Sequence, residues 1–400
     1  MPQYLSPGVY VEEVPSGLNV IAGVSTSVAG FVGRVADNVT LPPIPGKFEK
    51  KANSEELDPE KPIRYSVADV GEPYLVTSWD AFKTRFGDFQ AGNSVLAHAV
   101  YGFFNNGGTR CWVARVNSAN LTTKGVQDTL ATFEAIDEIS LVIVPGASEA
   151  ATQQATIDHC AKMGDRFAIL DGQEVPNAYT PALVKGAVSN SDYAAMYFPY
   201  IQVYDPASDD LIYVPPSGHM AGVYARVDGQ RGVHKAPANE PIRGAVGLEW
   251  KLSKADQDGL NPAGINVIRE MNGRILVWGA RTLGGDANGE WKYVNVRRLF
   301  LYLRESLDEG TQWVVFEPND RNLWAKIRLN VTAFLSIVWK DGALFGSSPA
   351  EAFYVRCDDT NNPAAVRDLG QVITEIGVAV NKPAEFVIFR ISQWAGPSAT

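Results

Sequence analysis

Residues 139–172 read ISLVIVPGASEAATQQATIDHCAKMGDRFAILDG, and this stretch decides the fold of the chain. It opens with a continuous apolar run that ends in Pro-Gly, which is typical of a buried strand. A helix-forming segment follows at residues 149–165, and residues 166–172 form a second buried apolar run. A strand, a helix and a strand in this order, with apolar strands, predict a parallel pair joined by a crossover helix.

The same alternation continues on both sides of this stretch. Ser94 is placed to be the N-cap of one helix, and the Asn-Asn-Gly-Gly run after its apolar stripe ends that helix. The repetition predicts an α/β fold with a mainly parallel sheet covered by helices. The further predicted strands are residues 19–35, 109–116 and 193–205, and the further predicted helices are residues 78–87, 94–108 and 124–138.

Other segments break the alternation. Residues 37–64 are proline-rich and highly charged, which favours an exposed loop insertion. Residues 214–248 are dense in glycine and proline. Further on, Asn272-Gly273 predicts a hairpin turn. A later helix is indicated by apolar residues at helical spacing, namely Trp324, Ile327, Val331, Phe334 and Val338.

Composition bounds the class of protein. The 400 residues are 46% hydrophobic and 20% charged, which favours a substantial packed core over disorder. The net charge of −10 argues against a general nucleic-acid binder, which needs a basic surface to neutralise phosphates. Cys111, Cys160 and Cys357 lie far apart, so we expect reduced, buried thiols in a protein made in the cytosol. We expect no signal peptide and no membrane helix.

The α/β half invites an enzyme interpretation, but the motifs that would carry it are missing. No GxGxxG follows a strand, and there is no P-loop, HExxH or GxSxG sequence. His98, His159, His219 and His234 do not cluster at metal-ligand spacing, so we expect no metal and no cofactor.

Two weak catalytic candidates remain. Ser217 and His219 lie in a glycine-rich segment with Asp228 nearby, but residues two apart seldom face each other and triads are assembled across a fold. Asp171 ends a predicted parallel strand, beyond Pro145 on the strand before it, where α/β folds often bind ligands. It has no identifiable partner carboxylate, so a turn or capping role is favoured.

The two ends of the chain raise a different question. Residues 9–14, VYVEEV, form a strand pattern between Pro-Gly and Pro-Ser-Gly, and no neighbouring segment makes a hairpin with it. Residues 385–394, EFVIFRISQW, form a second apolar strand pattern. Such a strand is an exposed-edge hazard unless something pairs with it. Either the two strands complete a sheet of their own domain, or they add to sheets of neighbouring subunits.

An ordered set of segments along the chain resembles the sheath proteins of contractile tails, which occur in phages, R-type bacteriocins and extracellular contractile injection systems. The resembling segments are PGVYVEEVPSG (7–17), NNGGTRCWVARV (105–116), VPPSGHMAGVYARVDGQRGVHKAPAN (214–239), NPAGINVIR (261–269), VWGARTL (277–283), YVNVRRLFLYL (293–303), FEPNDRNLW (316–324), GALFG (342–346), EAFYVRCDDTNN (351–362) and IGVAVNKPAEFVIFRI (376–391).

The resemblance implies that both terminal strands are arms, each donating a strand to a sheet in a neighbouring subunit. Flexible hinges would let the arms keep subunits linked. The implied arm residues are Val9, Tyr10, Val11, Glu12, Glu13, Val14, Phe386, Val387, Ile388, Phe389, Arg390 and Ile391, and the hinge candidates are Gly17, Gly23, Gly396 and Pro397.

The resemblance also implies a domain plan: an N-terminal arm (1–20), an outer α/β domain (21–205), an inner α+β domain (206–384, with the N-terminal strand) and a C-terminal arm (385–400). In that plan the segment 214–239 is a structural joint. The surface that grips the inner tube lies on a helix in the C-terminal half, near residues 324–339 or near residues 363–369, and the two remain open.

The function implied is a structural, force-generating subunit that polymerises around an inner tube and contracts. The implied partners are further copies in stacked rings, expected to be hexameric, the tube protein, and baseplate and tail-terminator or cap proteins. Direct nucleic-acid and membrane contacts are not expected. Assembly in the bacterial cytoplasm as part of a virion or phage-tail-like particle is implied too. The alternative is a soluble α/β enzyme with a site at the strand ends near Asp171.

Overall fold

The structure is a computed structural model that describes residues 20–51, 55–117, 122–175 and 177–390. Its contacts divide the chain into two compact units. The sheet unit comprises Val24–Glu305, Asp341–Ala343 and the described residues from 380 onward. The C-terminal unit comprises residues 20–23, Ser306–Lys340 and Leu344–Ala379. Later strands continue the sheet begun by earlier ones within the sheet unit, and the expected division into segments 21–205 and 206–384 stays a prediction.

The sheet unit is built on a nine-stranded sheet in the order β11-β14-β13-β8-β7-β6-β1-β5-β4. The six strands from β13 to β5 are parallel. At the two ends of the sheet, β4 pairs antiparallel with β5, β14 pairs antiparallel with β13, and β11 pairs antiparallel with β14. The α/β fold class with a mainly parallel sheet is therefore confirmed. The strands are β1 (Ala29–Arg34), β4 (Tyr74–Val76), β5 (Cys111–Val116), β6 (Leu141–Ile143), β7 (Phe167–Asp171), β8 (Ala194–Phe198), β11 (Glu240–Pro241), β13 (Ile265–Met271) and β14 (Arg274–Val277).

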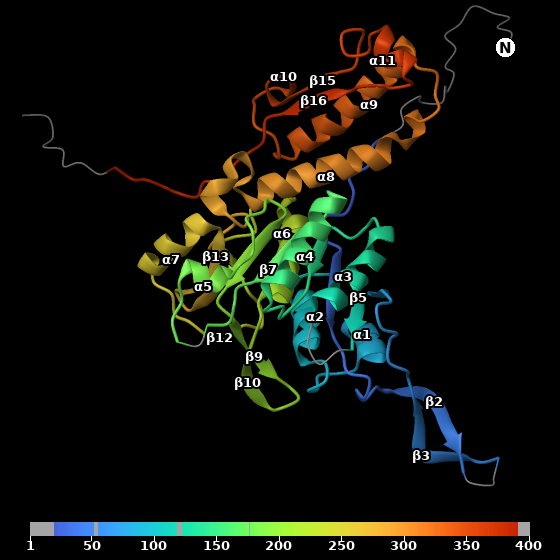
Figure 1. Ribbon diagram of the computed structural model, residues 1–400, viewed down its shortest axis with the longest axis vertical. Helices are drawn as coiled ribbons and strands as arrows, with labels where there is room; N and C mark the ends of the chain where they lie inside the picture. Colours follow the sequence, from blue (N-terminus) through green and yellow to red (C-terminus); the bar gives the residue numbers. More distant parts are fainter. Residues whose placement is uncertain (1–19, 52–54, 118–121, 176, 391–400) are drawn as a thin grey trace, which may run out of the picture. The chain divides into compact units, whose positions relative to one another are not determined.

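Two helical layers cover the sheet, because successive strand residues face opposite sides. On β1, Phe31 belongs to the hydrophobic cluster under α1, α2 and α6, whereas Val32 belongs to the cluster under α3 and α4. Figure 1 shows these helices along the sheet. The helices of this unit are α1 (Trp79–Phe86), α2 (Ser94–Asn106), α3 (Thr123–Thr132), α4 (Ala150–Met163), α5 (Pro181–Lys185), α6 (Ser217–Arg231), α7 (Lys254–Leu260) and the first part of α8 (Val294–Thr311).

Several strand predictions need correction in their extent. The predicted strand at residues 193–205 is two strands, β8 and β9 (Ile201–Asp205), because Pro199 breaks the run and has no N–H for a ladder. β9 pairs instead with β10 (Asp210–Val214) and β12 (Gly247–Leu248) in a separate three-stranded sheet. The predicted strand at residues 19–35 is regular only over β1.

The helix predicted at residues 94–108 is confirmed, but its start is not. Asn93, not Ser94, occupies the N-cap position. Its side-chain amide donates to the carbonyls of Phe86 and Asp88, so it stabilises the preceding turn rather than the helix N–H groups. The stop is as predicted, since Gly107 adopts a left-handed conformation after the last turn.

Two segments that interrupt the predicted strand–helix alternation form regular secondary structure. The predicted exposed loop at residues 37–64 contains a hairpin of β2 (Pro43–Lys50) and β3 (Leu57–Arg64), most of whose residues are exposed. The glycine-rich part of the predicted structural joint at residues 214–239 is the buried helix α6. Two of its glycines lie close against the backbone of α2.

The C-terminal unit contains the second half of α8, α9 (Arg321–Lys340), α10 (Pro349–Ala352), α11 (Ala364–Asp368) and a two-stranded antiparallel sheet of β15 (Phe353–Arg356) and β16 (Glu375–Val378). The helix predicted from Trp324 to Val338 is confirmed as α9, and its five predicted apolar residues are all buried.

In the sheet unit, the predicted hairpin turn at Asn272-Gly273 joins β13 to β14, with positive φ at both residues. Among the described residues, no helix is long and apolar enough to cross a membrane.

Candidate assembly site

The described residues 386–390 of the predicted C-terminal arm, named here the C-terminal segment, are exposed and apolar. The exposed fractions of Phe386, Val387, Ile388 and Phe389 are 69, 69, 77 and 84%. Within the part of the chain that the structure describes, this segment pairs with no strand. It therefore does not complete a sheet of its own unit there, and it offers unpaired backbone groups and apolar side chains together.

The predicted N-terminal arm, the last predicted residue of the C-terminal arm and most predicted hinges lie outside the described residues. These are Val9, Tyr10, Val11, Glu12, Glu13, Val14, Ile391, Gly17, Gly396 and Pro397. Gly23 is described and exposed, and it is the last residue before the chain passes from the C-terminal unit into the sheet unit. It stays a hinge prediction.

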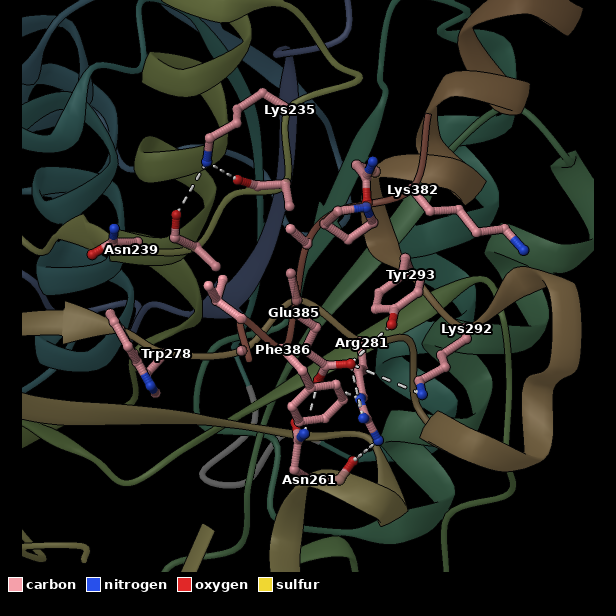
Figure 2. Close-up of a pocket in the computed structure, with 18 of the residues that line it drawn as sticks. Lys235, Asn239, Asn261, Trp278, Arg281, Lys292, Tyr293, Lys382, Glu385 and Phe386 are labelled. Atoms are coloured by element: carbon pink, nitrogen blue, oxygen red, sulfur yellow. Dashed lines mark hydrogen bonds and ion pairs between the residues drawn. The ribbon is translucent and has the colours of Figure 1, made fainter. Parts of the chain in front are cut away.

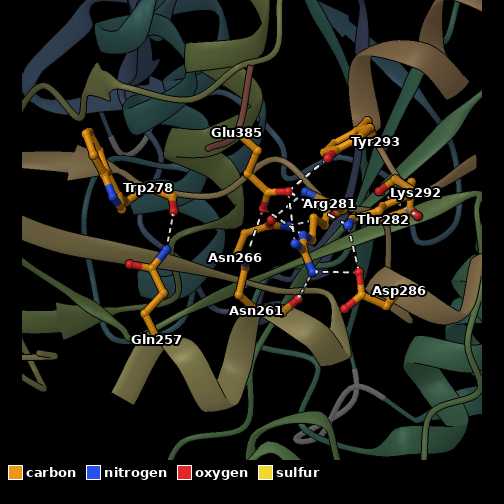
Figure 3. Close-up of polar contacts among 10 residues, drawn as sticks. All are labelled: Gln257, Asn261, Asn266, Trp278, Arg281, Thr282, Asp286, Lys292, Tyr293 and Glu385. Atoms are coloured by element: carbon orange, nitrogen blue, oxygen red, sulfur yellow. Dashed lines mark hydrogen bonds and ion pairs between the residues drawn. The ribbon is translucent and has the colours of Figure 1, made fainter. Parts of the chain in front are cut away.

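The residue before the C-terminal segment is held firmly, in contrast to the segment itself. One carboxylate oxygen of Glu385 accepts from Arg281 Nε at 2.7 Å and from Asn261 Nδ2 at 2.8 Å. The other accepts from Arg281 Nη2 and from the Tyr293 hydroxyl, both at 2.9 Å. Figure 3 shows these donors converging on the carboxylate. A bidentate arginine pair with two further donors is a strong, directional contact, and we name this group the Glu385 clamp.

The pKa directions indicate that the Glu385 carboxyl of the clamp is ionised at neutral pH. Burial raises the pKa of Glu385, but the hydrogen bonds from Arg281, Asn261 and Tyr293 outweigh that effect and bring the pKa below its usual value. Burial, followed by the hydrogen bond to Glu385, raises the pKa of Tyr293 to about 12, so this hydroxyl remains a donor at neutral pH.

The arginine of the clamp is itself immobilised. Its side chain is only 3% exposed, and Nη1 also donates to the Asn261 carbonyl and to the Asp286 carboxylate, each at 3.1 Å. Its backbone N–H donates to the buried amide oxygen of Asn266 on β13 at 2.7 Å, and its carbonyl accepts from that amide at 2.8 Å. The clamp is therefore part of the rigid sheet unit.

A second tether lies four residues earlier, at Asn381. Its side-chain amide donates to the carbonyl of Gly342 at 2.8 Å. Asn295 on α8 donates to the carbonyl of Asn381 at 3.4 Å. After β16 in the C-terminal unit, the chain is thus tied to the sheet unit at Asn381 and again at Glu385.

We name residues 381–385, which carry these tethers, the root of the C-terminal segment. A pocket of about 1300 Å³ lies beside the root, and residues 382–387 form part of its wall (Figure 2). Basic side chains outnumber acidic ones in its lining. Lys235 donates to the carbonyls of Ala236 and Ala238, and burial lowers its pKa.

The C-terminal unit carries a complementary feature. β15 and β16 form a sheet of only two strands, with register Phe353 to Val378 through Arg356 to Glu375. Two-stranded sheets are marginal alone. No other described strand pairs with this sheet, and Tyr354 on it is about half exposed.

The structure brings Ser217 to Asp171, but it does not bring Ser217, His219 and Asp228 together as a triad. The Ser217 hydroxyl and N–H donate to Asp171 at 2.7 and 2.8 Å, so Asp171 holds the start of α6. His219 is fully buried, and burial lowers its pKa to about 3. Asp228 instead accepts from Arg298 at 2.6 Å and from Thr26 at 2.7 Å.

The remaining histidines are also dispersed. His98 lies 3.2 Å from Asp205, whereas burial and the charge of Arg166 lower the pKa of His159 to about 4. The described residues contain no group of three or more His, Cys, Asp or Glu side chains that could hold a metal. Cys111, Cys160 and Cys357 are free and buried.

Sequence reasoning missed the Glu385 clamp. Glu385 and Arg281 are 104 residues apart, and neither lies in a sequence motif that predicts contact with the other. The one usable signal was a charged residue directly before an apolar run, which on its own is too common to predict an ion pair.

Two family models match consecutive parts of the chain: the phage tail sheath protein central domain at residues 119–283 and the phage tail sheath C-terminal domain at residues 286–393. The tail sheath protein of Vibrio phage KVP40 is 29% identical over 212 residues, which are 52% of this chain and 30% of that relative. The chain thus spans less than a third of the length of that curated relative.

Solved structures match nearly the whole chain. A chain of the anti-feeding prophage baseplate is 28% identical, with a TM-score of 0.73 over 98% of this chain and 99% of that one. A chain of the sheath complex of an extracellular contractile injection system, in its contracted state, is 27% identical, with a TM-score of 0.74 over 99% of each chain. Together with the two consecutive domain matches, these likenesses show that the chain belongs to the phage tail sheath family.

Proposed function

We propose that this protein is a structural subunit of a contractile sheath, which polymerises helically around an inner tube and contracts to drive that tube through a target envelope. The observation that carries the proposal is the exposed, unpaired C-terminal segment at the end of a firmly held root. The full-length likeness to sheath chains supports it.

The segment's chemistry fits strand addition to a second copy. Four consecutive large apolar side chains are costly to leave in water, and their backbone groups need partners if they become buried. The two-stranded sheet of β15 and β16 is the acceptor that we propose, because a third strand would both stabilise it and cover apolar side chains. A segment of one copy that joins a sheet of the next makes a heterologous contact, which propagates into an open helical assembly.

Contraction follows from such links. Subunits move as near-rigid bodies into a shorter, wider lattice while the arms keep neighbours connected. The driving free energy comes from contacts between subunits, so the function needs no catalytic residue. This agrees with a buried Asp171 that is already occupied by Ser217 and Gly146, rather than open to a substrate as the enzyme alternative requires.

The partners that we propose are further copies in stacked, hexameric rings, the inner tube, the baseplate and a terminator or cap protein. Baseplate and sheath assemblies are what the matched structures contain. The particle would be assembled in the bacterial cytoplasm. The tube-gripping helix is either α9, which exposes Leu329 and Ile337, or the short α11, followed by exposed Leu369.

Proline substitution tests strand addition by the C-terminal segment. Ile388→Pro and Phe389→Pro each remove a side chain and a backbone N–H, whereas Ile388→Thr and Phe389→Thr remove only the side chain. Since alternate N–H groups of an added strand face the acceptor, at least one proline variant should form no striated tubes in negative-stain electron microscopy with the tube protein. Both threonine variants should assemble. Normal tubes from both proline variants would count against the proposal.

A further inference from the structure

Exposed and half-buried residues alternate from residue 381 to residue 385, and every described residue from Phe386 onward is exposed. The Glu385 side chain is 18% exposed and makes four hydrogen bonds, whereas Phe386 is 69% exposed and the described residues after it pair with no strand. Glu385 is therefore the last half-buried residue before the C-terminal segment.

We propose that the Glu385 clamp is the anchor of the C-terminal arm: it sets the position and direction in which the arm leaves, and the arm pivots directly after it. Glu385 is thus a positioning residue for strand donation. This inference rests on the proposed function for its consequence in assembly, but not for the anchor itself. It moves the pivot to the bond after Glu385, ten residues before the predicted hinge at Gly396.

The donors of the clamp come from separate pieces of the sheet unit. Asn261 follows α7, Arg281 follows β14, and Tyr293 immediately precedes α8. A backbone bridge joins Arg281 to Tyr293, and Lys292 lies 3.9 Å from the Glu385 carboxylate. Pulling on the arm would therefore load several elements of the unit at once rather than peel off a single loop. This is the arrangement that a link between subunits needs.

The clamp can be opened without unfolding the protein. In a Glu385→Gln variant, Arg281 keeps its contacts with Asp286 and with the Asn261 carbonyl, so its buried charge stays partnered. The amide that this substitution introduces cannot replace the charged bidentate acceptor. Loss of hydrogen bonds to a charged group should raise the population with a released root about tenfold.

Spin labels measure this in the unassembled full-length chain. The three native cysteines are buried, so labels attach selectively to Ile388→Cys on the arm and Lys251→Cys, an exposed position of the sheet unit. We expect a narrower distance distribution when Glu385 is intact and a clearly broader one in Glu385→Gln. Tyr293→Phe, which removes one of the four hydrogen bonds, should fall in between.

Glu290→Gln is the matched control. It removes the same charge from an exposed position in the neighbouring 3-10 segment Gly285–Trp291, where no contact with Glu385 is made. It should leave the distance distribution unchanged. An unchanged distribution in Glu385→Gln, or equal broadening in Glu290→Gln, overturns the anchor.

Assembly is the second readout, measured with the unlabelled variants and the tube protein by electron microscopy. Glu385→Gln should give fewer and shorter tubes than Glu290→Gln, and equal tubes overturn the role of the anchor in strand donation. Deletion of residues 386–400 is the separate test of the proposed function. If that deletion assembles normally, the arm itself is not needed, whatever the spin labels report about the anchor.

Discussion

At the scale of single residues, Asp171 shows how a candidate catalytic carboxylate serves structure. Its oxygens accept from the N–H of Gly146, the N–H of Ser217 and the Ser217 hydroxyl. It thereby joins the end of β7 to the turn after β6 and to the start of α6. Burial nevertheless raises its pKa to about 6, because the three hydrogen bonds only partly offset the loss of hydration.

The raised pKa of Asp171 predicts a pH dependence of stability. In the unfolded chain this carboxyl ionises near its ordinary pKa of 3.8, so between about pH 4 and pH 6 the folded state binds more protons. Stability from this group should fall as pH rises through that window, by about 3 kcal/mol, and stay lower above it.

Asp171→Asn tests that dependence, because the amide does not titrate. The difference in free energy of unfolding between the native protein and Asp171→Asn, from urea unfolding at several pH values, should decline across pH 4 to 6. Histidines that also titrate there, such as His159, cancel in the difference. A difference that is flat with pH would mean that Asp171 is not desolvated in solution.

At the scale of elements, the packing of α6 on α2 depends on glycines. A Cβ on Gly222 would lie 2.4 Å from the Phe103 carbonyl oxygen, and one on Gly218 would lie 2.4 Å from the Ala99 Cα. Both contacts involve backbone, which cannot move aside. The glycines of the segment that was expected to be a joint are therefore needed for close helix approach.

Gly222→Ala should lower the free energy of unfolding by about 1–3 kcal/mol, the usual cost of overpacking a core. Gly229→Ala is its control on the same helix, since a Cβ there meets nothing within 4 Å. That control should be neutral or more stable by about 0.5–1 kcal/mol, because alanine favours helix. Urea unfolding midpoints check both, and equal effects at the two positions would contradict this account.

At the scale of the whole molecule, each of the two units is built from segments that lie far apart in the sequence. It passes into the sheet unit after Gly23, forms the second unit from Ser306 onward, and returns to the sheet unit at Val380. The start of the predicted C-terminal arm therefore belongs to the sheet unit, although the strand before it, β16, belongs to the C-terminal unit. The proposed arm would start in one unit and the proposed acceptor sheet would lie in the other, which is the arrangement we expect of a protein that links copies.

Removal of either arm should leave a folded, soluble protein that does not assemble. Deleting residues 386–400 removes no described strand pairing, so the free energy of unfolding should change by no more than about 0.5 kcal/mol. Deleting residues 1–14 should behave alike by the sequence prediction. Urea unfolding and electron microscopy check the pair, and intact contractile sheaths from the N-terminal deletion would refute that arm assignment.

Local pattern determined much of this protein. Apolar runs and helical spacing predicted β6, α4, β7 and α9, and Asn272-Gly273 predicted the β13–β14 turn, because these features depend on neighbouring residues. The strand predicted at residues 385–394 stays a prediction: its described part pairs with no strand in this chain, and a strand ladder needs a partner.

Tertiary structure alone decided the contacts between distant residues. Glu385 meets Arg281 across 104 positions, Ser217 meets Asp171 across 46, and the α6 glycines meet α2. Periodicity indicates which face of an element is buried, but not which side chain lies opposite. Hydrogen bonds and close backbone contacts depend on positions within a few tenths of an ångström, and only the packed fold sets those.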